Sequence, residues 1–311
     1  MSVAKALCSF AFLTTYLTHR IIDETSVFIF KNWRHLLWPG DLRRIKKNLG
    51  YWASCISNKI GAKILLLCFG FLDGTKLNTC RPGGHDKVQE VLFDGHHRQH
   101  AISFHGITAP DGTFVHFFGP FSGNRTDEFM YGESNLEAMW KAGEFTDDDG
   151  KEYFVYADCG YTSGYGILAG WKEATGIFRR SNYIWSKQRI SVEWGFGAVK
   201  SLWKMLSFRY LQKPQRSRVS VWYLVCIILT NCHMCLHRSQ ASLYFDCKPP
   251  NIEEYLHPRD AEFDRAFEKY KRKSYPMAYI DEVDSDNDEH CSNEGESEEE
   301  KDNCPTEIVE I

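Results

Sequence analysis

The chain has 311 residues, and its content of 43% hydrophobic and 14% aromatic residues excludes a disordered or fibrous protein and predicts one main globular domain. The formal charge of −4 conceals an asymmetry, because residues 281–311 hold fourteen Asp and Glu and one Lys, a local charge of −13, which leaves +9 on residues 1–280. The body of the protein is therefore basic, as a polyanion-binding surface requires.

Residues 1–62 form the first predicted region, a short helical one in which apolar residues are interleaved with basic ones. The segment 4–17 has the apolar character of a secretion signal, but Lys5 interrupts it and no clear small-residue cleavage site follows. The eleven cysteines have an odd count and no repeating spacing, which argues against a full set of disulfides. We therefore expect a reducing compartment.

A continuous apolar run, residues 64–69, comes next and ends at Gly70. Such a run is typical of a strand that is buried on both faces. Asp73 follows, so we expect its carboxylate at or near the end of this strand. A single aspartate in this position is usually a cap or turn residue, and only its neighbours can indicate another role.

Two further strands are predicted at residues 101–107 and 113–118, because a Pro-Asp-Gly turn signal lies between them. A helix around residues 134–140 and a strand over 153–157 follow, and Asp158 stands at the end of that strand. The predicted order is a strand, a hairpin, a helix, a strand and a helix, with carboxylates at the ends of the first and fourth strands.

The region around Glu193 has the period of an amphipathic helix. One apolar stripe of this helix is expected to pack on the core: Val192, Phe196, Val199 and Trp203. Glu193 and Lys200 share the neighbouring stripe, seven residues apart. Both side chains can therefore face a cleft while the helix stays anchored.

Folding could bring Asp73, Asp158 and Glu193 together, since two of them follow strands and the third lies on a helix. Carboxylates are the preferred ligands of hard divalent cations, and a cluster of three suits phosphodiester chemistry. Two strand carboxylates and one helical carboxylate match the plan of ribonuclease-H-like nucleases. We therefore predict the α/β class, with a ribonuclease-H-like mixed sheet flanked by helices.

Five ordered sequence blocks resemble those of PIF/Harbinger-type transposases of the DDE superfamily. They extend from about Tyr51 to His237, and five blocks in order are far more specific than any one of them. The strongest element is the spacing Arg-x3-Glu-x6-Lys at Arg189, Glu193 and Lys200. The blocks are 71–75, 100–112, 119–127, 158–161 and 189–200.

The resemblance implies that Asp73, Asp158 and Glu193 are catalytic and bind two Mg²⁺ or Mn²⁺ ions. Asp127 matches a further aspartate of the family and is the alternative second carboxylate. We prefer Asp158 because it ends a strand that pairs with the strand of Asp73 in this fold. Asp127 opens the following helix, where a carboxylate can serve as a cap.

Two basic residues of the Glu193 helix complete the implied site. Arg189 and Lys200 would pair with phosphates or hold the carboxylates in place. Two positions depart from the family pattern, because Lys76 replaces a frequent histidine and Ser186 replaces a frequent tyrosine. Neither departure removes a carboxylate, so we expect the metal site to be retained.

The implied substrate is double-stranded DNA, cut by metal-assisted hydrolysis or strand transfer. The resemblance also implies a nuclear location, a separate DNA-binding partner protein and a homo-oligomer. A basic stretch would hold the flanking duplex: Lys204, Arg209, Lys213, Arg216 and Arg218. Two other functions stay open, a DNA-binding or chromatin-associated protein that has lost catalysis, and a scaffold protein that uses its acidic tail.

The predicted organisation is the helical region, a nuclease domain over residues 63–240, an extension over 241–280 and a disordered acidic tail over 281–311. Residues 221–229 are apolar but much shorter than the roughly 20 residues of a membrane span. They predict a buried helix and no membrane association.

Two histidine-containing groups are weaker candidates for metal binding. The first resembles a zinc knuckle but continues an apolar helix, and no second ligand pair follows at the spacing of a zinc finger. The second precedes a strand in a block that has no such role in the family. We expect a metal at neither group. The first group is Cys232, His233, Cys235 and His237, and the second is His96, His97 and His100.

Overall fold

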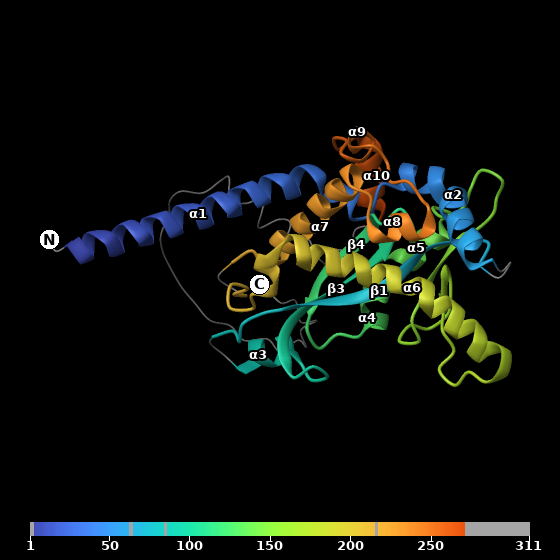
Figure 1. The fold of residues 1–311 in the computed structure, drawn as a ribbon, viewed down its shortest axis with the longest axis horizontal. Helices are drawn as coiled ribbons and strands as arrows, with labels where there is room; N and C mark the ends of the chain where they lie inside the picture. Colours follow the sequence, from blue (N-terminus) through green and yellow to red (C-terminus); the bar gives the residue numbers. More distant parts are fainter. Residues whose placement is uncertain (1–2, 62–64, 84–85, 215–216, 271–311) are drawn as a thin grey trace, which may run out of the picture.

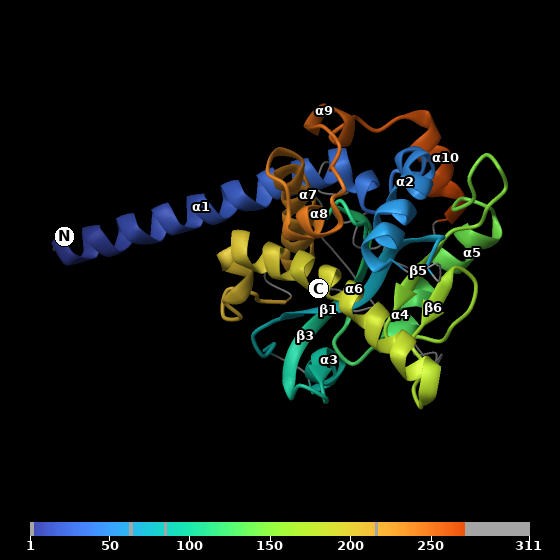
Figure 2. The same ribbon diagram turned by 45° about the vertical axis from the view of Figure 1, so that its right-hand side comes forward.

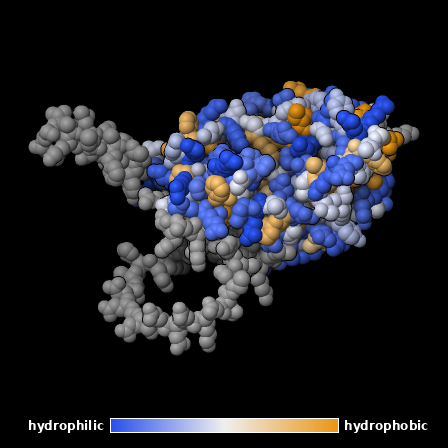
Figure 3. Space-filling model, turned by 90° about the horizontal axis from the view of Figure 1, so that it is seen from below, coloured by the Kyte–Doolittle hydropathy of each residue, from blue (hydrophilic) through white to orange (hydrophobic). Residues whose placement is uncertain are grey.

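The computed structural model describes residues 3–61, 65–83, 86–214 and 217–270 (Figure 1). It has a mixed, curled sheet flanked by helices, which confirms the predicted α/β class. The predictions for Arg216 and for the acidic tail lie outside the described residues. The face of the molecule in Figure 3 is mostly hydrophilic, with hydrophobic side chains in small groups.

In the described part of the chain the sheet has six strands, in the order β2-β3-β1-β5-β6 with β4 paired to β3. β1 is antiparallel to β3 and parallel to β5, which in turn is parallel to β6. The strands are β1 (Cys68–Asn78), β2 (Phe93–Asp94), β3 (Gln99–Thr108), β4 (Phe114–Ser122), β5 (Phe154–Ala157) and β6 (Ile167–Ala169).

Helices precede, connect and follow the strands. In the N-terminal region α1 extends away from the rest of the molecule (Figures 1 and 2). The helices are α1 (Val3–Trp33), η1 (Arg34–Leu36), α2 (Leu42–Ile60), α3 (Asp86–Leu92), α4 (Asp127–Glu133), α5 (Leu136–Lys141), α6 (Gly176–Leu202), η2 (Lys204–Ser207), α7 (Val219–Leu236), α8 (Gln240–Phe245), α9 (Ile252–Tyr255) and α10 (Ala261–Tyr270).

Neighbouring residues of β4 build the core on opposite faces of the sheet, because successive strand side chains alternate. Phe117 contacts Phe196 of α6 and Tyr223 of α7, with ring centroids 6.4 and 5.7 Å apart. Phe118 contacts Trp38 on the other face, at 5.4 Å. The sheet is therefore covered on both sides, and α6 is fixed against one of them.

The first strand differs from its prediction. It begins at Cys68 instead of residue 64 and continues to Asn78, so Asp73 lies within the strand and not at its end. The reason is pairing: β3 follows β1 as far as Asn78, whereas the pairing with β5 ends at Leu72. Asp73 is thus the first residue of β1 beyond the part that is paired on both sides.

The other predicted elements are mostly confirmed. β3 and β4 form the predicted hairpin, and β5 ends one residue before Asp158. The predicted 134–140 helix is α5, and the helix around Glu193 is α6. The prediction missed α3, β2 and β6, which are short and carry little periodic signal.

The apolar helix α7 runs from Val219 to Leu236 and is long and apolar enough to cross a membrane, but 72% of it is buried inside the protein. This agrees with the predicted buried helix. Cys232, His233 and Cys235 of the zinc-knuckle candidate lie on α7, as the sequence indicated.

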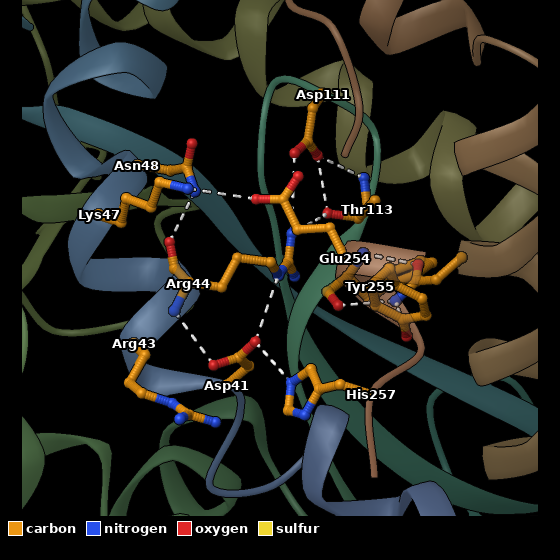
Figure 4. Close-up of polar contacts among 12 residues, drawn as sticks. Asp41, Arg43, Arg44, Lys47, Asn48, Asp111, Thr113, Glu254, Tyr255 and His257 are labelled. Carbon is orange, nitrogen blue, oxygen red and sulfur yellow. Dashed lines mark hydrogen bonds and ion pairs between the residues drawn. The ribbon is translucent and has the colours of Figure 1, made fainter. Parts of the chain in front are cut away.

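A buried polar cluster joins α2, the β3–β4 turn and the segment after α9 (Figure 4). Asp111 in the turn accepts hydrogen bonds from Trp52 Nε1 at 3.1 Å and from Thr113 N at 2.8 Å. Asp41 caps α2 through Arg44 N and contacts His257 Nε2 at 2.9 Å. These bonds hold the hairpin turn against α2, next to the core.

Candidate metal centre at β1, β5 and α6

Asp73 and Asp158 lie side by side where the pairing of β1 with β5 ends. Leu72 of β1 is paired with Ala157 of β5 in parallel register, and each aspartate is the next residue along the chain, Asp73 within β1 and Asp158 just beyond β5. The Asp73 side chain is only 15% exposed, and Asp158 is half-buried. The parallel register thus brings together the two carboxylates that the sequence predicted as a pair.

The electrostatic surroundings of Asp73 favour a cation. Burial raises the pKa of Asp73 to about 7; Arg189 opposes this shift, whereas Asp158 and Asp127 add to it. Like charges that share a site destabilise one another's ionised forms, and a bound cation relieves that cost.

Asp127 approaches the same place from α4. A Cβ atom built on Gly74 would lie 2.1 Å from Asp127 Oδ1, so the glycine at this point of β1 makes room for the carboxylate. The α4 cap is Thr126, whose hydroxyl accepts from Phe129 N, so capping does not account for the Asp127 carboxylate. Burial and then Asp158 raise the pKa of Asp127.

Glu193 joins the cluster through Arg189, one turn earlier on α6. Arg189 Nη1 lies 2.5 Å from Asp73 Oδ2, and its Nη2 lies 3.0 Å from Glu193 Oε1. The Glu193 side chain is 52% exposed, far more than that of Asp73. The guanidinium therefore links the buried end of the cluster to its open end.

The residues fit a hard divalent cation by their chemistry, since all the candidate ligands are carboxylate oxygens. Arg189 pairs with both Asp73 and Glu193, and its single positive charge offsets only one of the two carboxylates. Within the described residues, no three His, Cys, Asp or Glu side chains are arranged closely enough to hold a metal ion as they stand. Metal binding would require Arg189 to move from between the carboxylates.

Lys200 lies seven residues beyond Glu193, about 10 Å along the helix axis. It forms no ion pair with any carboxylate of the described residues, and burial lowers its pKa. The structure therefore does not bring Lys200 into the carboxylate cluster. It places Lys200 on the same stripe of α6 as Glu193, as predicted.

Sequence reasoning gave no role to Tyr161, which lies beside the cluster. Its side chain is 3% exposed, and its hydroxyl is buried with no hydrogen-bond partner among the described residues. Burial raises the pKa of Tyr161, and Asp127, Asp73 and Asp158 raise it further. The only sequence signal was its place in the Asp-Cys-Gly-Tyr block, where a turn returns the chain after Asp158.

Only part of the predicted basic stretch is exposed and available to bind DNA phosphates. Lys204, Arg209 and Lys213 are exposed, whereas Arg218 lies 3.9 Å from Asp23 of α1. Of the histidines set aside as metal ligands, His97 contacts Asp94 at 2.6 Å.

A family model described as DDE superfamily endonuclease matches residues 72–231, just over half of the chain. The match includes Asp73, Asp127, Asp158, Arg189 and Glu193. No curated protein and no solved structure matches the chain.

Proposed function

Since this chain belongs to the DDE superfamily endonucleases, we propose that it cuts double-stranded DNA by divalent-metal-assisted hydrolysis or strand transfer. The observation that carries the proposal is the excess of carboxylates at Asp73. Burial raises the pKa of Asp73, and Asp158 and Asp127 raise it further, although Arg189 lies 2.5 Å away. Such a cluster is costly unless a cation binds to it.

In the proposed site Asp73, Asp158 and Glu193 hold two Mg²⁺ or Mn²⁺ ions. Bound ions of this kind activate a water or a DNA 3′-hydroxyl and stabilise the leaving 3′-oxygen. The positions of Asp73 and Asp158 relative to each other are fixed by the sheet, because β1 and β5 are hydrogen-bonded up to the residue before each aspartate. Glu193, being more exposed, completes the site from the side of the substrate.

Arg189 has two positions in this proposal. Without metal it forms ion pairs with Asp73 and Glu193, as in the structure. With the carboxylates holding metal ions, the guanidinium would be free to pair with a phosphate oxygen, for which its planar fork is suited. Lys200 contacts a phosphate farther along the strand.

The second carboxylate is proposed to be Asp158, with Asp127 as the alternative. The parallel register favours Asp158, because it leaves β5 next to Asp73. The space made by Gly74 favours a contribution from Asp127 as well.

Further proposals rest on the PIF/Harbinger resemblance alone. These are a nuclear location, a separate DNA-binding partner protein and a homo-oligomer. The rival function is a DNA-binding or chromatin-associated protein that has lost catalysis, and metal-dependent nicking would exclude it. A scaffold protein would show no salt-dependent affinity for DNA.

The test is nicking of supercoiled plasmid DNA in Mg²⁺ or Mn²⁺ by the full chain and by Asp158→Asn and Asp127→Asn. We expect the Asp158 variant to lose activity, while the matched control Asp148→Asn, whose carboxylate is 97% exposed, keeps it. Activity retained by Asp158→Asn and lost by Asp127→Asn would assign the second carboxylate to Asp127. Equal activity in EDTA would exclude metal-assisted cleavage.

A further inference from the structure

A groove of about 510 Å³ begins at Glu193 and lies between α6 and the end of α7 with the start of α8. Trp194 and Gly197 line it on the α6 side, and His233 and His237 line it on the α7 side. Its volume lies in the range of ligand pockets, about 300–1,000 Å³. The groove therefore adjoins the proposed metal centre through one shared side chain.

Two glycines of α6 lie within one turn of Glu193, and only one of them is explained by packing. A Cβ atom on Gly195 would lie 3.0 Å from Phe114 Cζ, so the core requires a glycine there. Apart from its own helix, no described residue has a heavy atom within 4 Å of a Cβ atom built on Gly197. Glycine weakens a helix relative to alanine. The missing side chain at Gly197 leaves the groove open beside Glu193.

We propose that this groove binds an unpaired nucleotide of the DNA strand next to the cut phosphate, an inference that rests on the nuclease function proposed above. A phosphate bound at the proposed metal centre, to which Glu193 belongs, would place the adjoining nucleotide at the mouth of the groove. Trp194 offers an aromatic surface to the base. His233 and His237 offer imidazole groups that can donate hydrogen bonds to phosphate or base oxygens.

The exposed surface of α6 leads a strand into the groove. Tyr183, Lys187, Trp194 and Gly197 lie on one stripe of the helix, at spacings of four, seven and three residues. Tyr183 is 62% exposed, and Lys187 Nζ lies over its ring, 4.2 Å from the centroid. Aromatic rings interleaved with cations are the usual platform for single-stranded nucleic acid. The occupant is therefore a single strand rather than a peptide.

The test uses the full chain and a graded series at Gly197. Affinities of Gly197→Ala and Gly197→Leu for a fluorescein-labelled single-stranded dT oligomer, and for a duplex of equal length, are measured by anisotropy in EDTA. The matched control is Gly132→Leu, a helical glycine of α4 that is also exposed and has no heavy atom within 4 Å of a Cβ. Gly197→Met replaces the leucine variant if circular dichroism shows that the latter does not fold.

We expect Gly197→Leu to weaken binding of the single strand about tenfold, the loss of one stacked base. Gly197→Ala should bind almost as tightly as the unaltered protein, and so should Gly132→Leu. Unchanged affinity in Gly197→Leu, or an equal loss in Gly132→Leu, would overturn the proposal. An equal loss for the duplex would place paired DNA on this surface and overturn it as well. Because binding in EDTA requires no cleavage, this assay and the nicking assay can fail independently.

Discussion

Two arginine–carboxylate clusters of this protein have similar members and different surroundings. Arg44 is 4% exposed and lies 4.0 Å from both Asp41 and Asp111. Arg189 is 18% exposed and lies 2.5 Å from Asp73 and 3.0 Å from Glu193. By distance alone the second cluster has the stronger ion pairs.

The difference lies in the other neighbours of each carboxylate. Asp111 accepts hydrogen bonds from Trp52 and Thr113, and burial raises its pKa with no carboxylate among the causes. Asp73 has one backbone donor, Gly74 N, and two neighbouring aspartates. Carboxylates with enough fixed donors stabilise a fold, whereas carboxylates in excess of their donors provide a place for a cation.

The largest expected effect is on the stability of the Arg44 cluster. Arg44→Met should lower the free energy of unfolding by about 3–5 kcal/mol, because it leaves buried carboxylates without their cation. Arg189→Met should cost clearly less, since the pKa of Asp73 is already raised to about 7 and the carboxyl can take up a proton. Urea denaturation at pH 7 measures both. Equal losses would mean that the two clusters have the same role.

The next effect is on cleavage. Asp73→Asn should lower plasmid nicking about 100-fold or more, because it removes a metal-ligand charge. Its free energy of unfolding should not fall, because burial together with Asp158 and Asp127 already outweighs the attraction of Arg189 and raises the pKa of Asp73 to about 7. Asp111→Asn is the matched change in the other cluster and should destabilise the protein while the folded fraction still cuts DNA. A destabilised Asp73→Asn protein would contradict the assignment.

The sequence predicted best what depends on local periodicity. The apolar stripe of α6 placed Glu193 and Lys200 on one side of the helix, and the run before Asp158 gave β5. It gave the wrong position for Asp73 within β1, because the length of that strand is determined by pairing with β3, about 30 residues away in the chain. Tertiary pairing of this kind leaves little trace in a single strand's composition.

The contacts within the two polar clusters could not be predicted from the sequence either, because they join residues that are far apart in the chain. Arg44 was one of several basic residues of a helical region, and Asp111 was a turn residue. Their contact joins segments 67 positions apart. The hydroxyl of Tyr161 and the space above Gly74 likewise became visible only in three dimensions.

A third effect is a pH dependence of stability at His35, which lies beside the Arg44 cluster. Burial and then the charge of His257, which contacts Asp41, lower the pKa of His35 to about 4, while a hydrogen bond to the His257 backbone and the charges of Asp41 and Asp260 oppose the shift. As the pH falls, the unfolded chain takes up the proton near 6.5 and the folded protein only near 4, so stability is lost between these values. Between pH 7 and 5 the free energy of unfolding should fall by about 2 kcal/mol more in the unaltered protein than in His35→Phe. Equal falls, measured by urea denaturation, would contradict the buried neutral state of His35.

The smallest expected effect concerns Tyr161. Its hydroxyl is buried beside Asp73, Asp127 and Asp158 and has no hydrogen-bond partner in the part of the chain that the structure describes. Removing it should therefore leave the free energy of unfolding unchanged or slightly higher. If the hydroxyl donates to the reacting water or phosphate, Tyr161→Phe should lower kcat about tenfold with little change in KM. Tyr131→Phe is the control, because that hydroxyl donates to the backbone oxygen of Tyr165 instead. Unchanged kcat in Tyr161→Phe would restrict Tyr161 to packing behind the carboxylates.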